Sequence, residues 1–321
     1  MIPSIAVATA FERSRPHVNA LSSYQFEVEP PDASVVDKVC RSLWDRRGKR
    51  LRSHLVFWFG EMAGVEASRL SLYAWAAEAV HTATLLHDDV IDVATVRRGE
   101  PSANVLFGNT LPVLSGDYLL SDAVQRIAEK GEPRLLAGLC SALKQLVCGE
   151  SLQYELRFTI PKSDRIYWRI AELKTGALLK WAALAGPELA QSPWKTSLGS
   201  FMTSFGQLFQ FSDDLLDVLG AEDKEAWVDL KEGKLNYVTW QLLSREPDLV
   251  SYLTQKFAQK QVNDEVVRQV ERRVSKPFLK EVRQRLENLA DRAIESLCDL
   301  PHGNVRSAAE GLVKLCVDRT R

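Results

Sequence analysis

The sequence predicts an all-α fold, a single-domain bundle of more than four helices. Apolar residues recur at helical spacing along nearly the whole chain, capping residues or prolines precede the apolar stretches, and strand patterns are almost absent. The chain has 321 residues, 45% hydrophobic and 26% charged, which is ordinary for a globular protein with a sizeable core. These observations exclude disordered, collagen-like and coiled-coil architectures.

The expected helices follow one another with short connections. Small and apolar residues recur on one face of the long helix 69–92, whereas the charged stretches 93–102 and 220–235 are expected to be irregular. Residues 1–30 are expected to be a tail or docking segment ahead of a domain spanning 31–321. The helices cover 34–45, 51–62, 69–92, 111–130, 133–158, 163–185 and 192–219, and Asn236, Asn263, Pro277 and Asn304 open four more.

Charge, cysteine content and hydropathy limit the partners and the compartment. Lys plus Arg (41) nearly balance Asp plus Glu (42), so there is no global basic field to attract nucleic acid or an anionic membrane. Five scattered cysteines predict a reducing compartment without a disulfide framework or a zinc site. The most apolar run, 176–190, is broken by Lys180, Pro187 and Glu188, so no integral membrane segment is expected. We therefore expect a cytoplasmic protein with no nucleic-acid partner.

Two aspartate clusters close two of the expected helices. Within each cluster the carboxylates share one helical face, close to a helix C-terminus where they repel one another and oppose the helix dipole. A cation offsets both effects, and hard carboxylate oxygens suit Mg²⁺, which also binds substrate phosphates. One such cluster alone fits a solvated helix end, but two in matching contexts predict metal binding. The clusters are Asp88, Asp89 and Asp92, and Asp213, Asp214 and Asp217.

Basic residues precede or follow these clusters. Each alone is consistent with a solvated surface charge. Together with a metal held by carboxylates, they describe a site for a diphosphate, to which arginine gives bidentate contacts and lysine a movable point charge. The basic residues in question are Lys49, Arg50, Arg52, Arg97, Arg98, Lys174, Lys224, Lys231 and Lys234.

Eight motifs in order, from Gly48 to Lys234, resemble those of one enzyme family. They read GKRLR, HTATLLHDDVID, RRG, GDYLLSDA, GESLQ, KTGAL, FGQLFQFSDDLLD and DLKEGK. This set is similar to the trans-polyprenyl diphosphate synthases, and most similar to their long-chain, octaprenyl-type members. The resemblance implies an isoprenoid-synthase bundle around a deep cavity, a homodimer, and condensation of isopentenyl diphosphate with an allylic diphosphate.

The resemblance also implies roles for the matching positions. The metal would be Mg²⁺, about three ions with substrate bound, held by Asp88, Asp92 and Asp213, with Asp89, Asp214 and Asp217 as further ligands or their partners. The allylic diphosphate would be bound by Arg97, Lys174 and a lysine of the loop after the second cluster, Lys224 or Lys234. Isopentenyl diphosphate would be bound by Lys49, Arg52, His81 and Arg98. The carbocation would face oxygen dipoles of Thr175 and Gln210, with Phe209 packed beside them.

Product length would depend on the helix that carries Asp88, because the growing chain is implied to run along it. One helical turn is 5.4 Å, roughly one extended isoprene unit. The residues one turn upstream, Ala83 and Thr84, and the deeper Ala79 are not aromatic, which favours a long product. These small residues are equally consistent with close helix packing, and another helix or the dimer partner could form the floor.

Other functions are weighed against this one. A short-chain farnesyl or geranylgeranyl diphosphate synthase would share all the motifs. A class I terpene cyclase would normally carry a different second metal motif and lack the Lys49–Arg52 signature. A non-catalytic partner subunit would have lost aspartates, and a binding-only helical module would leave the twin clusters unexplained.

Overall fold

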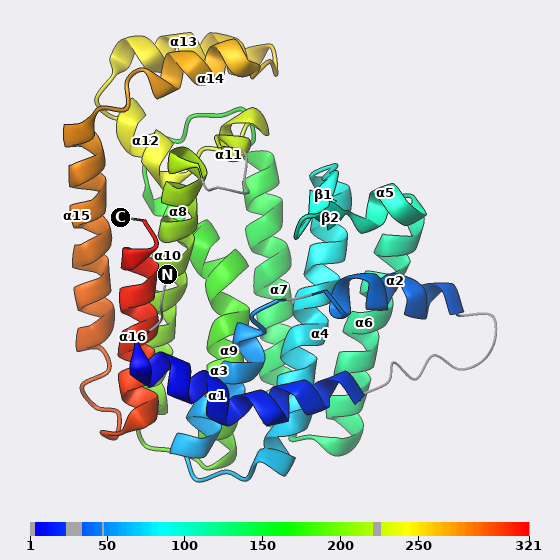
Figure 1. Cartoon of the computed structure of the whole chain (residues 1–321). Helices are drawn as coiled ribbons and strands as arrows, with labels where there is room; N and C mark the ends of the chain where they lie inside the picture. The colour runs from blue at the N-terminus through cyan, green and yellow to red at the C-terminus, as the bar shows by residue number, and fades with distance from the viewer. Residues whose placement is uncertain (1–3, 24–33, 47, 221–225, 321) are drawn as a thin grey trace. The chain divides into compact units, whose positions relative to one another are not determined.

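The computed structural model describes residues 4–23, 34–46, 48–220 and 226–320. In these ranges the chain is helical apart from one two-stranded hairpin, which confirms the all-α prediction (Figure 1). The residues divide into two compact units. We call Ala8–Ser141 with Trp181–Lys195 the N-terminal unit, and Met1–Val7 with Ala142–Lys180 and Thr196–Arg321 the C-terminal unit.

The N-terminal unit is built around helix α4. Small side chains such as Ala76, Ala79 and Ala83 are fully buried along α4, and they let α3 and α6 pack closely against it. Trp58 and Trp75 supply the bulk of the core around them. The elements of this unit are α1 (Ile5–Ala20, which starts in the other unit), η1 (Leu21–Ser23), α2 (Ser34–Trp44), α3 (Leu51–Met62), α4 (Ala67–Ile91), β1 (Val96–Arg97), β2 (Glu100–Pro101), α5 (Ala103–Phe107) and α6 (Thr110–Lys130).

Helix α1 lies in the segment that the sequence marked as a tail. It is bound to α3 by a buried polar and aromatic cluster. The indole Nε1 of Trp58 donates to the Ala10 carbonyl at 2.9 Å, and Ser14 Oγ lies 2.7 Å from His54 Nδ1. The Phe11 ring packs edge-on against His54, with centroids 4.6 Å apart. Apolar periodicity in this short stretch is weak, so the helix depends on tertiary packing rather than on its own pattern.

The buried His54 is expected to make the protein less stable in acid. Burial, followed by the charges of Arg15 and Arg50, lowers the pKa of His54 from 6.5 to about 4. Because the folded-state pKa lies below the unfolded value, the contribution of neutral His54 is fully present above pH 6.5 and is lost as pH falls toward 4. Between pH 6.5 and 4.5, the wild type should lose about 2–3 kcal/mol more unfolding free energy than His54→Gln. Urea titrations measure this difference, and equal losses in both proteins would contradict it.

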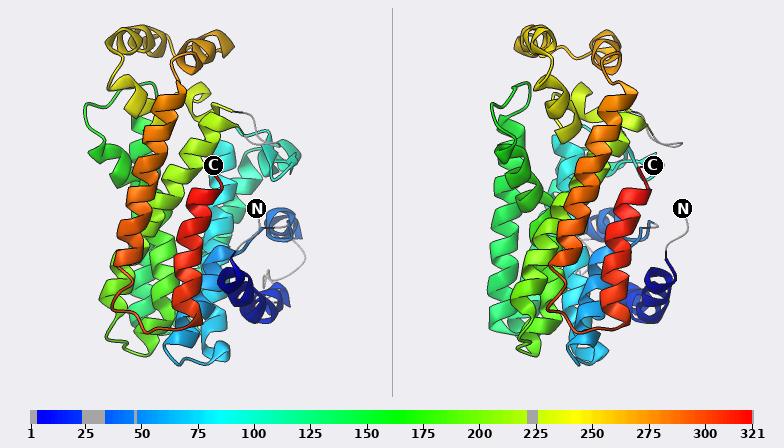
Figure 2. Two further views of the ribbon diagram at one scale, coloured as in Figure 1. Left: turned by 60° about the vertical axis from the view of Figure 1, so that its left-hand side comes forward. Right: turned by 90° about the vertical axis from the view of Figure 1, so that its left-hand side faces the viewer.

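The C-terminal unit is organised around helix α10 and an aromatic cluster. The Tyr237 ring lies 4.6 Å from both Phe211 and Trp168, measured between centroids. Figure 2 shows α15 and α16 running side by side in opposite directions. The elements are α7 (Pro133–Glu155, which starts in the other unit), α8 (Arg165–Ile170), η3 (Ala171–Gly176), α9 (Ala177–Leu189, which belongs to the other unit from Trp181 on), α10 (Lys195–Leu219, whose first residue belongs to the other unit), α11 (Val228–Lys231), α12 (Tyr237–Leu243), α13 (Pro247–Ala258), α14 (Asp264–Glu271), α15 (Lys276–Glu295) and α16 (Asn304–Asp318).

Side-chain caps set the starts of several C-terminal helices. The Asn236 side chain accepts from Thr239 N at 3.0 Å, and Asn263 caps α14 in the same way. Both predicted starts are confirmed. Helix α15 is capped by Ser275, so it starts one residue before the predicted Pro277, which lies in its first turn.

The helix expected over 163–185 is three elements. Between α8 and α9 the backbone forms one π-helical turn, Ala171–Gly176, which contains Lys174 and Thr175. A π-turn adds a residue to the helix and shifts the side chains that follow it, and such turns are frequent at functional sites. Periodicity alone does not reveal it because one added residue barely disturbs the apolar pattern.

Helix α7 is a further apolar stretch that the hydropathy pattern leaves to be considered. In the part of the chain that the structure describes, helix α7 is long and apolar enough to cross a membrane by length and composition, and 22% of its apolar stretch is buried. The hydropathy prediction rested on residues 176–190 and did not consider α7. All five cysteines lie within the described ranges, and none of them forms a disulfide there.

Candidate active site

The first aspartate cluster lies at the C-terminal end of α4. Asp92 is the helix cap, and its backbone N–H donates to the Asp88 carbonyl at 2.8 Å. Asp88 and Asp92 are partly exposed, whereas Asp89 is fully buried. Two carboxylates of the cluster are therefore accessible to a ligand, and the third can contact only buried groups.

The buried Asp89 holds Arg97 in the RRG motif. Arg98 and Gly99 have φ values of +56° and +79° and form the two-residue turn of the β1–β2 hairpin, a turn that needs positive φ at both positions. This turn brings Arg97 Nε to within 2.7 Å of Asp89 Oδ1. The other oxygen of Asp89, Oδ2, is buried and has no hydrogen-bond partner among the described residues.

Arg46 holds the hairpin in place through hydrogen bonds, a role that was not predicted from the sequence. Its Nη1 donates to the Arg97 carbonyl at 3.0 Å and its Nη2 to the Pro101 carbonyl at 2.8 Å. Arg98 in turn donates to the Arg46 carbonyl at 3.3 Å. The only sequence signal was one more arginine in a basic run. Arg46 thereby fixes the strands that carry Arg97 and Arg98.

A desolvated basic cluster lies on α3 and α4 of the same unit. Burial lowers the pKa of Arg52 and of His81, and the nearby Arg52 and Arg98 charges lower that of His81 further. His81 is therefore a neutral hydrogen-bonding group at neutral pH. Arg52 Nε is buried without a hydrogen-bond partner among the described residues. The buried Glu78, which accepts from Ser53 N at 3.0 Å, offsets part of the positive charge.

The second aspartate cluster ends α10 in the C-terminal unit. The carboxylate of Asp214 is buried and accepts from Gln210 Nε2 and from Tyr237 N, both at 2.9 Å. Asp217 accepts from Val228 N at 2.9 Å. These two aspartates tie the end of α10 to the segment containing α11 and α12. Asp213, with 43% of its side chain exposed, is the most accessible member and pairs with Arg319 at 2.8 Å.

A fourth carboxylate, Asp229 of the DLKEGK motif, adds to this cluster. Asn236 Nδ2 donates to Asp229 Oδ2 at 3.2 Å and to Asp217 Oδ2 at 3.3 Å. Burial, and then repulsion from Asp229, raises the pKa of Asp217 to about 7 and that of Asp214 well above its usual range. Burial likewise raises the pKa of Asp229. Such crowded acids favour a bound cation. The sequence analysis quoted this motif without assigning Asp229.

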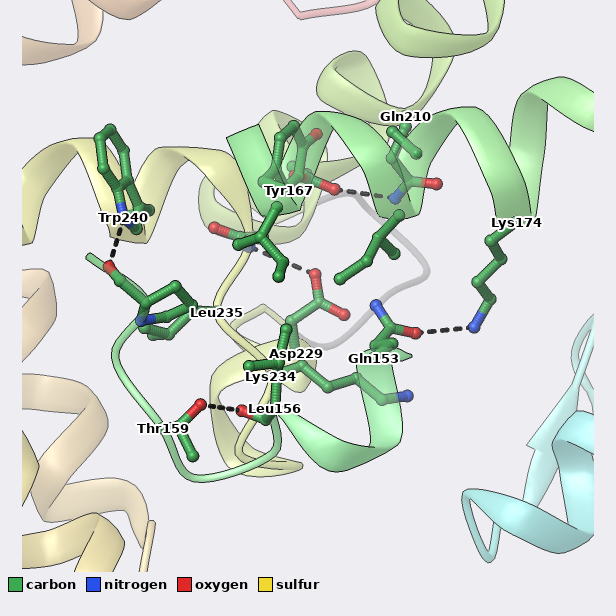
Figure 3. Close-up of a pocket in the computed structure, with 16 residues that line it drawn as sticks. Gln153, Leu156, Thr159, Tyr167, Lys174, Gln210, Asp229, Lys234, Leu235 and Trp240 are labelled. Carbon is green, nitrogen blue, oxygen red and sulfur yellow. Dashed lines mark hydrogen bonds between the residues drawn. The ribbon is translucent and has the colours of Figure 1, made fainter. Parts of the chain in front are cut away.

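Lys174 projects from the π-turn toward the pocket in Figure 3. Its Nζ donates to Gln153 Oε1 at 2.8 Å and forms an ion pair with Glu150. Both partners belong to the GESLQ motif of α7. A Cβ at Gly149 would lie 2.8 Å from Leu173 Cβ, so glycine is what lets α7 approach the π-turn closely. The sequence analysis gave Glu150 and Gln153 no role.

Several of the residues predicted from the sequence line this pocket, and others lie elsewhere in the fold. Lys174, Gln210, Asp214, Asp229 and Lys234 line it, and the Thr175 hydroxyl donates to Gln210 Oε1 at 2.7 Å. Other predicted residues lie elsewhere or are not described: the Phe209 ring lies under the Arg319 guanidinium, Lys49 is exposed, Ala79 and Ala83 are fully buried, Thr84 is partly exposed, and Lys224 is outside the described residues.

The donor set fits magnesium. No three His, Cys, Asp or Glu side chains in the described ranges converge into a ready-made cage. Mg²⁺ does not need one, since it is usually bound through one or two carboxylates, several waters and substrate phosphates. Asp88, Asp92 and Asp213 offer accessible hard oxygens. Asp88 and Asp92 in the N-terminal unit, and Asp213 in the C-terminal unit, are the residues that would hold such ions.

Residues 33–274 match the polyprenyl synthetase family. The chain belongs to this family. It is 29% identical over 299 residues to the octaprenyl diphosphate synthase of Escherichia coli, covering 90% of this chain and 92% of that one. It superimposes on a decaprenyl diphosphate synthase from Rhodobacter capsulatus with a TM-score of 0.90 and 28% identity, over 98% of both chains.

A second solved structure comes from Caulobacter crescentus. It is a polyprenyl synthase complexed with calcium and isoprenyl diphosphate, with a TM-score of 0.88 and 26% identity over 98% of both chains. This polyprenyl synthetase is thus a prenyltransferase that makes a polyprenyl diphosphate, and it resembles the long-chain members of the family.

Proposed function

We propose that this polyprenyl synthetase condenses isopentenyl diphosphate with an allylic diphosphate in repeated head-to-tail steps, depends on Mg²⁺ and makes a long-chain product. The observation that carries the proposal is that carboxylates and anchored cations occur together in each unit. Asp88 and Asp92 lie beside the Asp89–Arg97 pair, and Asp229 borders the same pocket as Lys174. The calcium and isoprenyl diphosphate named for the Caulobacter crescentus structure support this chemistry.

Departure of the allylic diphosphate is the step that needs charge neutralisation. Asp88, Asp92 and Asp213 would hold Mg²⁺, which would supply most of this neutralisation when bound. Lys174 donates to a diphosphate oxygen from a position fixed by Glu150 and Gln153, so little reorganisation is needed when negative charge develops. Arg97 does the same from its anchor on Asp89.

The carbocation that remains is stabilised by dipoles that do not attack it. The Thr175 hydroxyl donates to Gln210, and the Gln210 amide donates to Asp214. Because the Thr175 hydroxyl points its proton at Gln210 Oε1, the lone pairs of its own oxygen are left to face the cation. Both groups are uncharged, so they offer the cation dipoles rather than an anionic nucleophile.

Isopentenyl diphosphate is assigned to the basic cluster of α3, α4 and the hairpin. Arg52 and Arg98 bind its diphosphate with neutral His81 as a further hydrogen-bonding group, and the exposed Lys49 adds a movable charge. The double bond then attacks the allylic carbon, and the departed diphosphate takes the proton. No protein nucleophile takes part.

Mass spectrometry of products tests the proposal. Purified protein is incubated with Mg²⁺, farnesyl diphosphate and isotopically labelled isopentenyl diphosphate. We expect products that grow by five-carbon labelled units, and none when EDTA is added. A parallel incubation without isopentenyl diphosphate separates the alternatives, because a cyclic hydrocarbon from the allylic substrate alone would identify a terpene cyclase.

The long product leads to a prediction at Ala83. Ala83→Phe is expected to shorten the product, because an aromatic ring one turn upstream of the first cluster would block the growing chain. Ala83 is fully buried, so the same change should also lower stability by about 1–3 kcal/mol through overpacking. Thr84→Phe, at a partly exposed position, is the matched variant with less overpacking. An unchanged product distribution in both proteins would rule out a floor at this level.

We also propose that the chain forms a homodimer. Exposed apolar side chains occur on α5 (Val105 and Leu106), on α6 (Leu114) and on α7 (Val147 and Tyr154). The apolar stretch of α7 is mostly uncovered in a single chain. Exposed apolar surface of this kind marks protein–protein interfaces, so a second copy is the expected cover.

Charge placed on α7 should dissociate this dimer. Val147 is 66% exposed, so Val147→Glu costs little in the monomer but would bury an unpaired charge in the dimer. Light scattering after size exclusion should give twice the 36.1 kDa chain mass for the wild type and for the control Gln284→Glu on α15, and the single mass for Val147→Glu. A wild-type mass of one chain would refute the homodimer.

A further inference from the structure

The C-terminal turn of the chain reaches the second aspartate cluster through Arg319. Arg319 follows α16, and its Nη2 pairs with Asp213 Oδ1 at 2.8 Å. Two other contacts hold the guanidinium independently of that carboxylate. Its Nε donates to Ser212 Oγ at 2.6 Å, and its Nη2 donates to the Phe209 carbonyl at 3.1 Å. The guanidinium also lies 4.8 Å from the centroid of the Phe209 ring.

These anchors make Arg319 a fixed cation rather than a mobile one. Ser212 is fully buried and donates its own proton to the Cys316 carbonyl at 2.6 Å, so its oxygen is oriented to accept from Arg319. The guanidinium would therefore keep its hydrogen bonds to Ser212 and to the Phe209 carbonyl if the Asp213 carboxylate bound a metal ion instead. An ion that approaches Asp213 meets this positive charge in place.

We propose that Arg319 is a positioning residue that holds Asp213 and lowers the affinity of the second cluster for a divalent ion until the diphosphate arrives. The inference rests on the proposed role of Asp213 as a metal ligand. A unit charge beside a ligand oxygen repels an incoming divalent ion, and the repulsion is reduced by solvent because Asp213 is partly exposed. The charges of a bound diphosphate outweigh it, so metal and substrate bind together.

Two opposite effects of removing Arg319 can be ranked. Loss of the ion pair frees the Asp213 side chain, which weakens metal binding, whereas loss of the charge strengthens it. Asp213 stays on α10, whose end is also anchored by Tyr237 N through Asp214 and by Val228 N through Asp217. The restraint from Arg319 is therefore partly redundant, and the charge effect is the larger.

Binding of Mn²⁺ to the substrate-free protein tests the proposal by calorimetry. Arg319→Gln should bind Mn²⁺ about fivefold more tightly than the wild type at low salt, and the difference should shrink as salt is added. Arg319→Lys, which keeps the charge, should stay near the wild type. Arg319→Met is the second neutral variant, in case Arg319→Gln does not fold.

A matched control variant distinguishes the effect of losing the Arg319 charge from the effect of loosening the C-terminal turn. Arg283 of α15 donates its Nε to the Thr320 carbonyl at 3.0 Å, so Arg283→Gln loosens the same turn without touching Asp213. It should leave the Mn²⁺ dissociation constant unchanged. The proposal is overturned if the neutral Arg319 variants bind Mn²⁺ no more tightly than the wild type, or if Arg283→Gln tightens binding equally.

One further variant separates the proposed metal role of Asp213 from the proposed role of Arg319. Asp213→Asn should weaken Mn²⁺ binding whatever Arg319 does. If it does not, the proposed metal role of Asp213 is wrong. If it does and the neutral Arg319 variants still show no gain, only the inference about Arg319 fails.

Discussion

Asp88→Ala and Asp213→Ala, one change in each unit, should each lower kcat by about 10²- to 10³-fold. Each removes an accessible carboxylate oxygen, and the diphosphate leaves only when its charge is neutralised. Initial rates of five-carbon addition at saturating substrates and Mg²⁺ measure the effect. Asp291→Ala, which removes an exposed carboxylate of α15, is the control and should keep the wild-type rate. Retention of that rate by either cluster variant would exclude its aspartate from metal binding.

Arg52→Gln should raise KM for isopentenyl diphosphate by roughly 10²-fold, because a desolvated charge pair with a diphosphate oxygen is lost. The KM for the allylic substrate should stay unchanged. Lys174→Gln should show the reverse pattern. Steady-state kinetics with each substrate varied in turn separate the two.

The thermal stability of Arg52→Gln shows whether a raised KM reflects lost substrate binding or general damage to the fold. Burial lowers the pKa of the Arg52 guanidinium, and its Nε has no hydrogen-bond partner among the described residues. In the free enzyme the cost of burying this charge opposes its attraction to Glu78, so Arg52→Gln should leave the melting temperature close to that of the wild type. A raised KM for both substrates together with a lower melting temperature would indicate general damage instead.

The sequence was most informative where periodicity or local chemistry determines structure. The helix 51–62 has its predicted bounds, and Asn236 caps α12 because an Asn side chain reaches the third N–H that follows it. The two aspartate clusters were found because they break the apolar pattern at helix ends. The same local reasoning could not see the RRG hairpin, whose strands are two residues long.

The residues that position the cations were harder to find because they act across the fold. Arg46 is 51 residues from the Arg97 carbonyl that it binds, and Gln153 is 21 residues from Lys174. Arg319 is 107 residues from Ser212. A single sequence carries no signal for such pairs. The π-turn was also missed, because one additional residue leaves the helical pattern nearly intact.

The proposed function requires metal at the Asp88 cluster and at the Asp213 cluster for binding of the allylic diphosphate. Calorimetric binding of farnesyl S-thiolodiphosphate, an analogue that does not ionise readily, tests it in the wild type, Asp88→Ala and Asp213→Ala. The account predicts that binding requires Mg²⁺ and that each variant binds at least about tenfold more weakly. Binding of equal strength in EDTA, or wild-type affinity in either variant, would contradict it.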